Sequence, residues 1–317
     1  MRYLITGTAG FIGSTLVDSL LADGHEVVGI DCFTEYYDPA IKRRNLERAL
    51  DHERFSLLEL DLARDLIPST ALEVDGVFHQ AAQAGVRASW GTEFATYTDM
   101  NVLATQRLLE AIAESPGRPR LVYASSSSIY GNALDRPTRE DATPAPVSPY
   151  GVTKLAAEHL CATYHHNFGL ATISLRYFTA YGERQRPDMA FNRFARAALT
   201  GAPITVYGDG TQSRDFTYVA DIVAANRAAM DTASVPFGVF NIGGGSTVTV
   251  REVLDLLGQI VGSPVDVAYG DRQAGDVRHT SADTSRARDL LGYAPTVDLA
   301  TGLAREVEWM RENVAVS

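Results

Sequence analysis

Hydrophobic and polar residues alternate in two recurring patterns along the first half of the chain. Short apolar runs of the kind found in buried strands occupy residues 2–6, 26–31, 55–61, 76–80, 121–125 and 172–178. Apolar positions at helical spacing occupy residues 11–23, 101–114 and 150–168. Strands that alternate with helices favour a parallel sheet with helices on both faces. We therefore predict an α/β fold built on a doubly wound parallel sheet.

The pattern changes after residue 178, where shorter elements are separated by loops rich in proline and glycine. This composition is typical of a lobe that captures a substrate. We predict that residues 1–178 form a Rossmann-type domain and that a segment near 214–245 returns to it. Residues 179–317 then form mainly a smaller, mixed α/β lobe. At 317 residues and 45% hydrophobic content, the chain is large enough for one large domain or two.

Composition and charge exclude several classes of partner. A formal net charge of −11 argues against broad contact with nucleic acid or anionic membranes, which require a basic surface. An anionic ligand must therefore meet a local cluster of basic residues. The two cysteines, Cys32 and Cys161, fit neither a disulfide framework nor a metal site, so we expect buried thiols and no metal. Met1 is followed by no leader, and no apolar run approaches the roughly 20 residues of a membrane helix. We expect a cytoplasmic protein.

Tyr150 and Lys154 are the candidates for acid–base chemistry, because residues four apart on a helix lie side by side. A free tyrosine titrates near pH ~10, and a phenolate at neutral pH needs about 4 kcal/mol of stabilisation. One cation ~5 Å away supplies about 3 kcal/mol. We expect Lys154 to lower the pKa of Tyr150, with a second nearby positive charge completing the shift. The alternative is an aromatic ring packed under a lysine stem.

A glycine-rich turn follows the first predicted strand. Gly7, Gly10 and Gly13 are spaced so that backbone amides at a helix start can approach a pyrophosphate. Asp31 ends the second strand 18 residues after Gly13, where a carboxylate binds ribose hydroxyls and repels the extra phosphate of NADP. This pattern predicts NAD as the cofactor. The alternatives are a plain tight turn and, for Asp31, a cap of the turn that follows it.

Other candidate cofactor contacts lie mostly at the ends of predicted strands. Asp61 and Leu62 follow the third strand and are placed to flank an adenine, with plain strand-end packing as the alternative. Gln80, Ala81 and Ala82 follow the fourth strand and are placed to border the ribose and phosphates, with the same alternative. The remaining candidates are Phe11, Ile12, Asn101 and Tyr177.

Four motifs occur in one order: the glycine turn, the acidic strand end, the run SSSSIYG at 125–131, and Tyr150 with Lys154. Together they resemble the extended short-chain dehydrogenase/reductase family, specifically its nucleotide-sugar epimerases, decarboxylases and dehydratases. The resemblance implies that Tyr150 is the acid/base and that Lys154 lowers its pKa and holds the nicotinamide ribose. It also implies that Ser126 shares the substrate proton, with Ser127 as the alternative. Helices 101–114 and 150–168 would pair with a second copy in a homodimer, or pack only within the chain.

The residues beside Ser126 separate the members of this family. Decarboxylases and dehydratases carry an acidic residue there, whereas Ser127 and Ser128 are neutral. A dehydratase also needs an additional acid/base, and nothing in this stretch provides one. Neutral hydroxyls instead suit a sugar carboxylate, which they hold without repulsion.

The run RYFTAYGERQRPDM at 176–189 resembles UDP-glucuronate 4-epimerases. The resemblance implies that Thr179 and Arg186 bind the C6 carboxylate. UDP-glucose 4-epimerases have Asn in the position of Thr179. A guanidinium suits a carboxylate because it offers two parallel donors. The alternative is that Arg184 and Arg186 are solvated loop charges.

Further segments resemble the nucleotide-binding parts of the same family. By this resemblance Gln212 and Arg214 hold the diphosphate, and Gln273 and Asp276 hold the uridine ribose. Residues beside the uracil would be Thr205, Val206 and Tyr207. Two further residues fall in runs similar to the subgroup, Lys42 as a cofactor contact and Arg87 as a substrate contact, with solvated charges as the alternative.

The sequence thus predicts NAD-dependent 4-epimerisation of a UDP-hexuronate, UDP-glucuronate to UDP-galacturonate, through a transient 4-keto sugar. The alternatives within enzymes are a UDP-glucuronate decarboxylase and a UDP-glucose 4-epimerase. From another class, the alternative is a non-catalytic NAD-sensing protein of the same fold.

Overall fold

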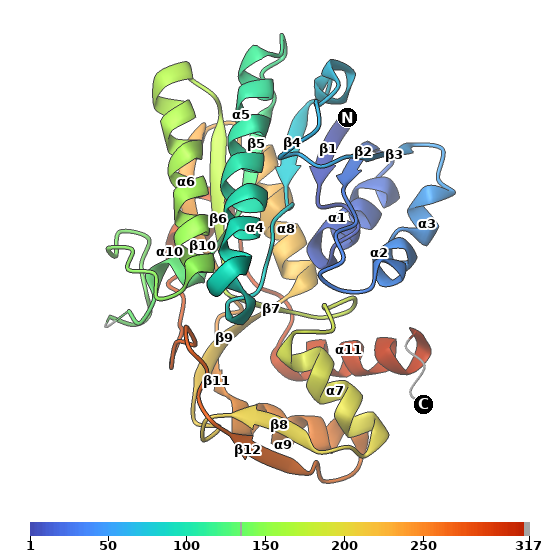
Figure 1. Ribbon diagram of the computed structural model, residues 1–317, viewed down its shortest axis with the longest axis vertical. Helices are drawn as coiled ribbons and strands as arrows, with labels where there is room; N and C mark the ends of the chain where they lie inside the picture. The colour runs from blue at the N-terminus through green and yellow to red at the C-terminus, as the bar shows by residue number, and fades with distance from the viewer. Residues whose placement is uncertain (134, 314–317) are drawn as a thin grey trace.

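A seven-stranded parallel sheet forms the larger part of the protein, in a computed structural model that describes residues 1–133 and 135–313 (Figure 1). Each strand is hydrogen-bonded in parallel to its neighbours. In spatial order the strands are β10 (Phe237–Ile242), β6 (Thr172–Tyr177), β5 (Arg120–Ser126), β4 (Gly76–His79), β1 (Arg2–Thr6), β2 (Glu26–Asp31) and β3 (Phe55–Glu59). This sheet confirms the predicted fold class.

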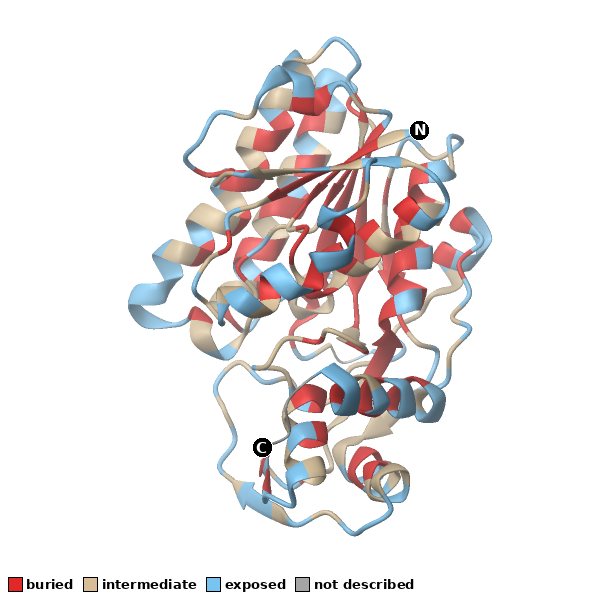
Figure 2. Ribbon diagram, turned by 90° about the vertical axis from the view of Figure 1, so that its right-hand side faces the viewer, coloured by how far each residue is buried: buried red, intermediate tan, exposed pale blue. Residues whose placement is uncertain are grey.

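Helices cover both faces of the sheet, so its strands other than the edge strand β3 are buried on both sides (Figures 1 and 2). Leu4 packs in the cluster on one face and Ile5 in the cluster on the other, because successive side chains of a strand point to opposite faces. The helices of the two faces are α1 (Phe11–Ala22) with α8 (Val219–Asp231), and α5 (Ala104–Glu114) with α6 (Pro149–Phe168). Two-sided burial explains why these strands are continuous apolar runs in the sequence.

Helix α6 is fixed at both ends by its own sequence. The Ser148 hydroxyl accepts a hydrogen bond from the Gly151 backbone N–H at 3.1 Å, and Pro149 occupies the first helical turn. Gly169 ends the helix in the left-handed conformation, with φ of 70°. Tyr150 therefore lies in a capped and rigid first turn.

Helix α5 begins later than the sequence pattern predicts. Residues Thr98–Leu103 form a π-helical turn, and regular α-helix starts only at Ala104. Within this turn the Asn101 side chain bonds to the backbone of Gln83, and the Thr105 hydroxyl donates to the Asn101 carbonyl at 2.7 Å. These bonds offer the backbone an alternative to the regular helical ladder.

Shorter helices connect the strands of the large sheet. They are α2 (Pro39–Asn45), α3 (Glu47–Leu50), α4 (Phe94–Tyr97) and the 3₁₀ turns Ser69–Leu72, Arg87–Ser89, Gly91–Glu93 and Ser127–Tyr130. Several of these segments follow the carboxyl ends of strands, the edge where α/β sheets bind ligands.

A smaller mixed α/β lobe lies beyond that edge of the sheet (Figure 1). Its core is a separate cluster of buried apolar residues. One small sheet has the order β11 (Thr247–Thr249), β9 (Ser213–Tyr218), β7 (Thr179–Tyr181), and another pairs β12 (Val267–Gly270) with β8 (Ile204–Tyr207). The helices of the later chain are α7 (Ala190–Thr200), α9 (Val250–Val261), α10 (Ser285–Leu291) and α11 (Leu299–Asn313).

The chain passes between the two parts more than once. After β9 it returns to the large sheet, where α8 packs on one face and β10 adds the outermost strand beside β6. The two parts are thus interlaced rather than consecutive along the chain. Across residues 1–133 and 135–313, no helix has the length and apolar character needed to cross a membrane.

Candidate active site

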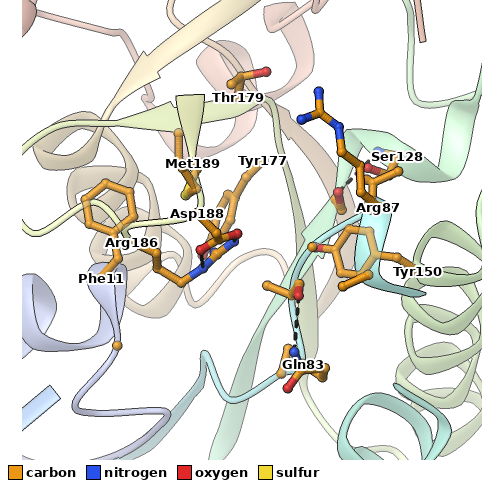
Figure 3. A pocket seen from close by; sticks show the side chains of 18 of the residues that line it. Phe11, Gln83, Arg87, Ser128, Tyr150, Tyr177, Thr179, Arg186, Asp188 and Met189 are labelled. Carbon is orange, nitrogen blue, oxygen red and sulfur yellow. Dashed lines mark hydrogen bonds and ion pairs between the residues drawn. The ribbon is translucent and has the colours of Figure 1, made fainter. Parts of the chain in front are cut away.

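A cavity of about 1080 Å³ runs along the carboxyl ends of the large sheet and continues into the smaller lobe (Figure 3). It opens where β1 and β4 are neighbours and their connections lead in opposite directions. Such a switch point is where open α/β sheets bind their ligands. The topology of the sheet therefore determines where the cavity lies.

The glycine turn forms one end of the cavity, and its backbone is too closely packed for side chains. A Cβ on Gly13 would lie 2.1 Å from the Gly7 carbonyl oxygen. A Cβ on Gly7, whose φ is +70°, would lie 2.6 Å from the Ala81 nitrogen. Glycine is required at both positions, because β1, α1 and the end of β4 converge there.

The Asp31 carboxylate stabilises two segments around this turn. One oxygen accepts from the Ala9 N–H and the other from the Phe33 N–H, each at 2.9 Å. Asp31 therefore caps the turn that follows it, the alternative suggested by the sequence. Each carboxylate oxygen can accept a further bond, so capping leaves capacity for a ligand hydroxyl at the cavity wall.

The exposure of Lys42 and of Cys32, near this end of the cavity, differs from what the sequence suggested. Lys42 is buried and donates to the Thr34 carbonyl at 2.6 Å, so it is not a solvated charge. Cys32 was expected to be buried, but its side chain is exposed and lines the cavity, because β2 ends at Asp31 where the sheet opens. Cys161 is buried as expected.

Tyr150, Lys154 and Ser126 line the middle of the cavity. Ser126 is the last residue of β5, and its hydroxyl accepts from the Ser128 backbone N–H at 3.1 Å. Tyr150 points toward the middle of the cavity from the first turn of α6, while Arg186 reaches in from the opposite side (Figure 3). A phenol, a hydroxyl and a lysine thus converge on one space.

The pKa of Tyr150 differs from the sequence-based expectation. Burial raises the pKa of this phenol, and hydrogen bonding with Ser126 and the positive charge of Arg186 offset the rise only in part. Burial also lowers the pKa of Lys154 to about 7, against which the Glu158 carboxylate acts. Desolvation therefore dominates the pKa of Tyr150, and Lys154, which was expected to lower it, is not among the groups that shift it. The deep site makes both groups sensitive to charges that a ligand brings.

Asn101 is the one predicted site residue that does not line the cavity in the described part of the chain. Its side chain bonds to both backbone groups of Gln83 and donates to the Thr153 hydroxyl at 3.0 Å. Asn101 thus supports the Gln83 segment, which does line the cavity, and its direct contact with the cofactor stays a prediction.

Arg184 and Arg186 are not the solvated loop charges that the sequence left open. The Arg184 side chain is 17% exposed and pairs with Asp18 of α1 at 2.7 Å. Arg186, 19% exposed, forms a two-bond ion pair with Asp188, with both N–O distances at 2.9 Å. Arg186 lines the cavity, together with Thr179 at the start of β7.

Basic and aromatic side chains gather at the end of the cavity formed by the smaller lobe. Arg87 pairs with Asp276 at 2.7 Å, and its guanidinium lies 4.3 Å from the centre of the Tyr207 ring. Arg214 donates to the carbonyl of Val277 and holds the segment after β12. This is the local basic cluster that an anionic ligand of an acidic protein requires.

Every sequence-predicted site residue other than Asn101 lines this one cavity. The cofactor candidates are Gly7, Gly10, Phe11, Ile12, Gly13, Asp31, Lys42, Asp61, Leu62, Gln80, Ala81, Ala82, Tyr150, Lys154 and Tyr177. The substrate candidates are Arg87, Ser127, Ser128, Thr179, Arg186, Thr205, Val206, Tyr207, Gln212, Arg214, Gln273 and Asp276.

Sequence reasoning missed other residues of the cavity wall. Among them are Tyr36, Tyr37, Asp188, Arg193, Arg272 and Arg278. Tyr36 and Tyr37 follow the end of β2, a position that could have suggested them. The arginines carry no local signal, because only the packing of the lobe brings them to the cavity.

Comparisons with known proteins identify the family of this chain. The model of the NAD dependent epimerase/dehydratase family matches residues 3–243. A UDP-glucuronate 4-epimerase of Thermodesulfobacterium geofontis is 38% identical, covering 98% of this chain and 97% of the relative. An uncharacterized UDP-glucose epimerase of Bacillus subtilis is 42% identical, covering 98% of each.

A solved structure is similar over the same length. The UDP-glucuronic acid 4-epimerase from Bacillus cereus, in complex with UDP-glucuronic acid and NAD, has a TM-score of 0.94 and 41% identity. The similarity covers 98% of this chain and 99% of that one. The family match, the full-length relatives and the switch-point cavity lead to one conclusion, that this chain belongs to the NAD dependent epimerase/dehydratase family.

Proposed function

We propose that this protein is an NAD-dependent UDP-glucuronate 4-epimerase, which interconverts UDP-glucuronate and UDP-galacturonate. The observation that carries the proposal is that Tyr150 and Arg186 reach into one cavity from opposite sides (Figure 3). One is a group for proton transfer at a sugar hydroxyl, and the other is a partner for a sugar carboxylate. The full-length similarity to UDP-glucuronate 4-epimerases supports the same assignment.

The residues at the β1 end of the cavity fit NAD. The turn at Gly7 and Gly13 excludes side chains, so its amides are accessible to a diphosphate. Asp31 keeps acceptor capacity for ribose hydroxyls and carries a charge that disfavours NADP. Lys154 and Tyr177 would border the nicotinamide end. Bound NAD supplies a reversible acceptor for the hydrogen of C4, which it returns to the opposite face of the sugar.

The chain's own residues move the proton. Tyr150 removes the proton of the C4 hydroxyl, directly or through Ser126, and returns it after the 4-keto sugar has turned over. Neighbouring cations must offset the burial that raises the pKa of Tyr150. Lys154 lies one helical turn after the tyrosine, is buried over the ring of Tyr123, and would gain charge when an anionic ligand enters, because its pKa is about 7.

The carboxylate of the sugar needs to be held apart from this chemistry. The 4-keto intermediate is a β-keto acid, which loses carbon dioxide when the breaking C–C bond aligns with the keto π system. Ser127, Ser128, Thr179 and Arg186 are neutral or cationic and would keep the carboxylate out of that alignment. The same four residues favour epimerisation over decarboxylation.

The other parts of the ligand follow from the same cavity. The lobe formed mainly by residues 179–317 would hold the UDP group, and residues 1–178 with the returning segment near 214–245 would hold NAD. Arg214 and Gln212 face the diphosphate in this arrangement, and Tyr207 lies beside the uracil. We assign Gln273 and Asp276 to the uridine ribose.

We also propose a homodimer and a cytoplasmic location. Leu103, Val152 and Phe168 are apolar yet exposed along the π-helical turn and α6, which favours a second copy as their partner. The exposed thiol of Cys32 suits a reducing compartment.

Incubation of the purified protein and NAD with UDP-glucuronate, followed by proton NMR, tests the function. The expected product is UDP-galacturonate, with no net change in NADH absorbance. A UDP-pentose would identify a decarboxylase instead. In a parallel incubation with UDP-glucose, conversion of that sugar without conversion of UDP-glucuronate would identify a UDP-glucose 4-epimerase. Retention of NAD without turnover of either sugar would favour a sensor.

A further inference from the structure

Arg186 has a carboxylate partner on its own chain. Its Nε and one Nη donate to the two oxygens of Asp188, each at 2.9 Å, in the fork geometry that a substrate carboxylate would also adopt. The two residues lie inside the cavity, opposite Tyr150 (Figure 3). Asp188 therefore forms with Arg186 the same kind of pair that is proposed for the carboxylate of the sugar.

The backbone that carries the pair is held in place, so any exchange of partners must be made by side chains. Arg184 has a left-handed φ of 64° and is anchored to Asp18 of α1. Gln185 is buried and accepts two hydrogen bonds from Asn192 of α7, each at 2.8 Å. Its side-chain oxygen accepts from the Asn192 backbone N–H, and its backbone carbonyl accepts from the Asn192 side-chain amide. An exchange of partners then needs only the side chains of Arg186 and Asp188 to turn.

The Arg186 side chain is 19% exposed and that of Asp188 35%, so the pair is partly desolvated and a counter-charge stabilises the guanidinium. A hexuronate brings its own carboxylate to Arg186, whereas a hexose brings only a hydroxymethyl group. With a hexose bound, Asp188 is the group that neutralises Arg186. With a hexuronate bound, Asp188 competes with the ligand for the same donors.

We propose that Asp188 sets the sugar specificity of this site by supplying the counter-charge of Arg186 whenever the bound sugar lacks a carboxylate. Asp188 lowers the cost of binding a neutral UDP-hexose and weakens the binding of a UDP-hexuronate. It thus narrows the difference in affinity between the two classes of substrate. This inference rests on the proposed function, because it takes Arg186 as the residue that binds the hexuronate carboxylate.

Asp188 acts through Arg186 and is a positioning residue, so the test measures a difference between two ligands. Isothermal titration of the NAD-loaded protein gives one Kd for UDP-glucose and one for UDP-glucuronate. The Kd for UDP-glucose divided by the Kd for UDP-glucuronate reports the preference for the hexuronate. In Asp188→Asn this ratio is expected to rise about tenfold or more, which corresponds to about 1.4 kcal/mol. An unchanged or reduced ratio would overturn the proposal.

Two further variants separate a switch from a general loss of structure. Glu59→Gln weakens the Arg43–Glu59 pair, which also has two hydrogen bonds but lies exposed and outside the cavity, and it should leave the ratio unchanged. In an Arg186→Gln background, Asp188→Asn should no longer change the ratio, because the group to be neutralised is absent. A full effect in that background would show that Asp188 does not act through Arg186.

The outcomes keep the two proposals apart. If the unaltered protein fails to epimerise UDP-glucuronate yet Asp188→Asn shifts the Kd ratio, the proposed function fails and the role of Asp188 stands. If epimerisation is observed but the ratio does not move, only the role of Asp188 fails. Asp188→Ser provides the same comparison if the asparagine variant is poorly folded.

Discussion

Glu158 and Arg176 form a two-bond ion pair that is only 5% exposed on either side chain, one helical turn beyond Lys154. Arg176 Nη2 lies 2.6 Å from Glu158 Oε1, and Nε lies 3.1 Å from Oε2. The Ser125 hydroxyl donates to the same carboxylate at 2.6 Å. The pair therefore joins α6, which carries Tyr150, to β6 and to the end of β5, which carries Ser126.

Replacing Glu158 by Gln should destabilise the protein strongly, because it leaves the guanidinium of Arg176 buried without a counter-charge. The expected loss is about 3–5 kcal/mol in the free energy of unfolding, measured by denaturant titration. Glu59→Gln, which breaks an exposed pair of the same geometry, should leave the unfolding midpoint nearly unchanged. Similar midpoints for the two variants would contradict this account of the pair.

Stability should fall as the pH drops below neutrality, in part because of His79. This residue is fully buried, bonded to the hydroxyls of Thr6 and Thr105, and burial lowers its pKa to about 3. Between pH 6.5 and about 3 the unfolded chain binds a proton that the folded protein lacks. Stability contributed by the neutral ring is therefore present above this window and lost through it, at up to about 1.4 kcal/mol per pH unit.

His79→Gln removes this titration and should flatten the dependence of the unfolding free energy on pH between 6.5 and 4. The exposed His159 on α6 provides the control, and His159→Gln should keep the slope of the parent protein. Equal slopes for His79→Gln and the parent protein would show that His79 does not contribute.

The Arg186 guanidinium should matter more for a charged sugar than for a neutral one. Arg186→Ala is expected to weaken UDP-glucuronate binding about ten- to hundredfold, the range for a charge-assisted bond, with a much smaller change for UDP-glucose. Arg196→Ala, on an exposed position of α7 outside the cavity, should affect neither ligand. Equal losses for both sugars in Arg186→Ala would remove the carboxylate role.

Gly13→Ala should impair NAD binding, because the new methyl group would lie 2.1 Å from the Gly7 carbonyl oxygen and displace the turn. We expect the NAD dissociation constant to rise by at least about tenfold, or about 1.4 kcal/mol, by fluorescence titration. Gly117→Ala is the matched control, since a Cβ there meets nothing within 4 Å. Unaltered NAD affinity in Gly13→Ala would mean that the turn does not form the cradle.

The sequence was sufficient for strands β1 to β6 of the large sheet and for the residues that follow them, whereas β10 was expected only as part of a segment near 214–245 that returns to the domain. Strands buried on both faces are continuous apolar runs, as in β1, where Leu4 and Ile5 are buried on opposite faces. Such a run can be recognised in the sequence without knowledge of tertiary contacts. The glycine turn is equally local, because close packing of the backbone around Gly7 and Gly13 admits no other residue. Residues near strand ends then come together at one edge of a parallel sheet.

The remaining features depend on contacts between distant segments. Arg87 and Asp276 are 189 positions apart and meet only because the lobe folds over the sheet. The depth of Tyr150 and Lys154, which reverses the expected effect on the tyrosine pKa, is likewise a tertiary property. Asn101 has the spacing of a helical residue, yet its side chain supports Gln83 through the π-helical turn.

Tyr150→Phe isolates proton transfer from binding. The variant keeps the aromatic ring that packs edge-on against Tyr97, with ring centres 6.2 Å apart, but it loses the hydroxyl. Turnover of UDP-glucuronate should be abolished while NAD stays bound, as measured by NMR and by the NAD content of the purified protein. Full activity in this variant would refute the assignment of Tyr150.

The most direct test of the account follows the hydrogen at C4. UDP-glucuronate labelled with deuterium at C4 is incubated with the protein and NAD in ordinary water, and the product is examined by NMR. The account predicts UDP-galacturonate that retains deuterium at C4, because the same hydrogen leaves one face and returns to the other. UDP-galacturonate with protium at C4, or a product without the carboxylate, would contradict it.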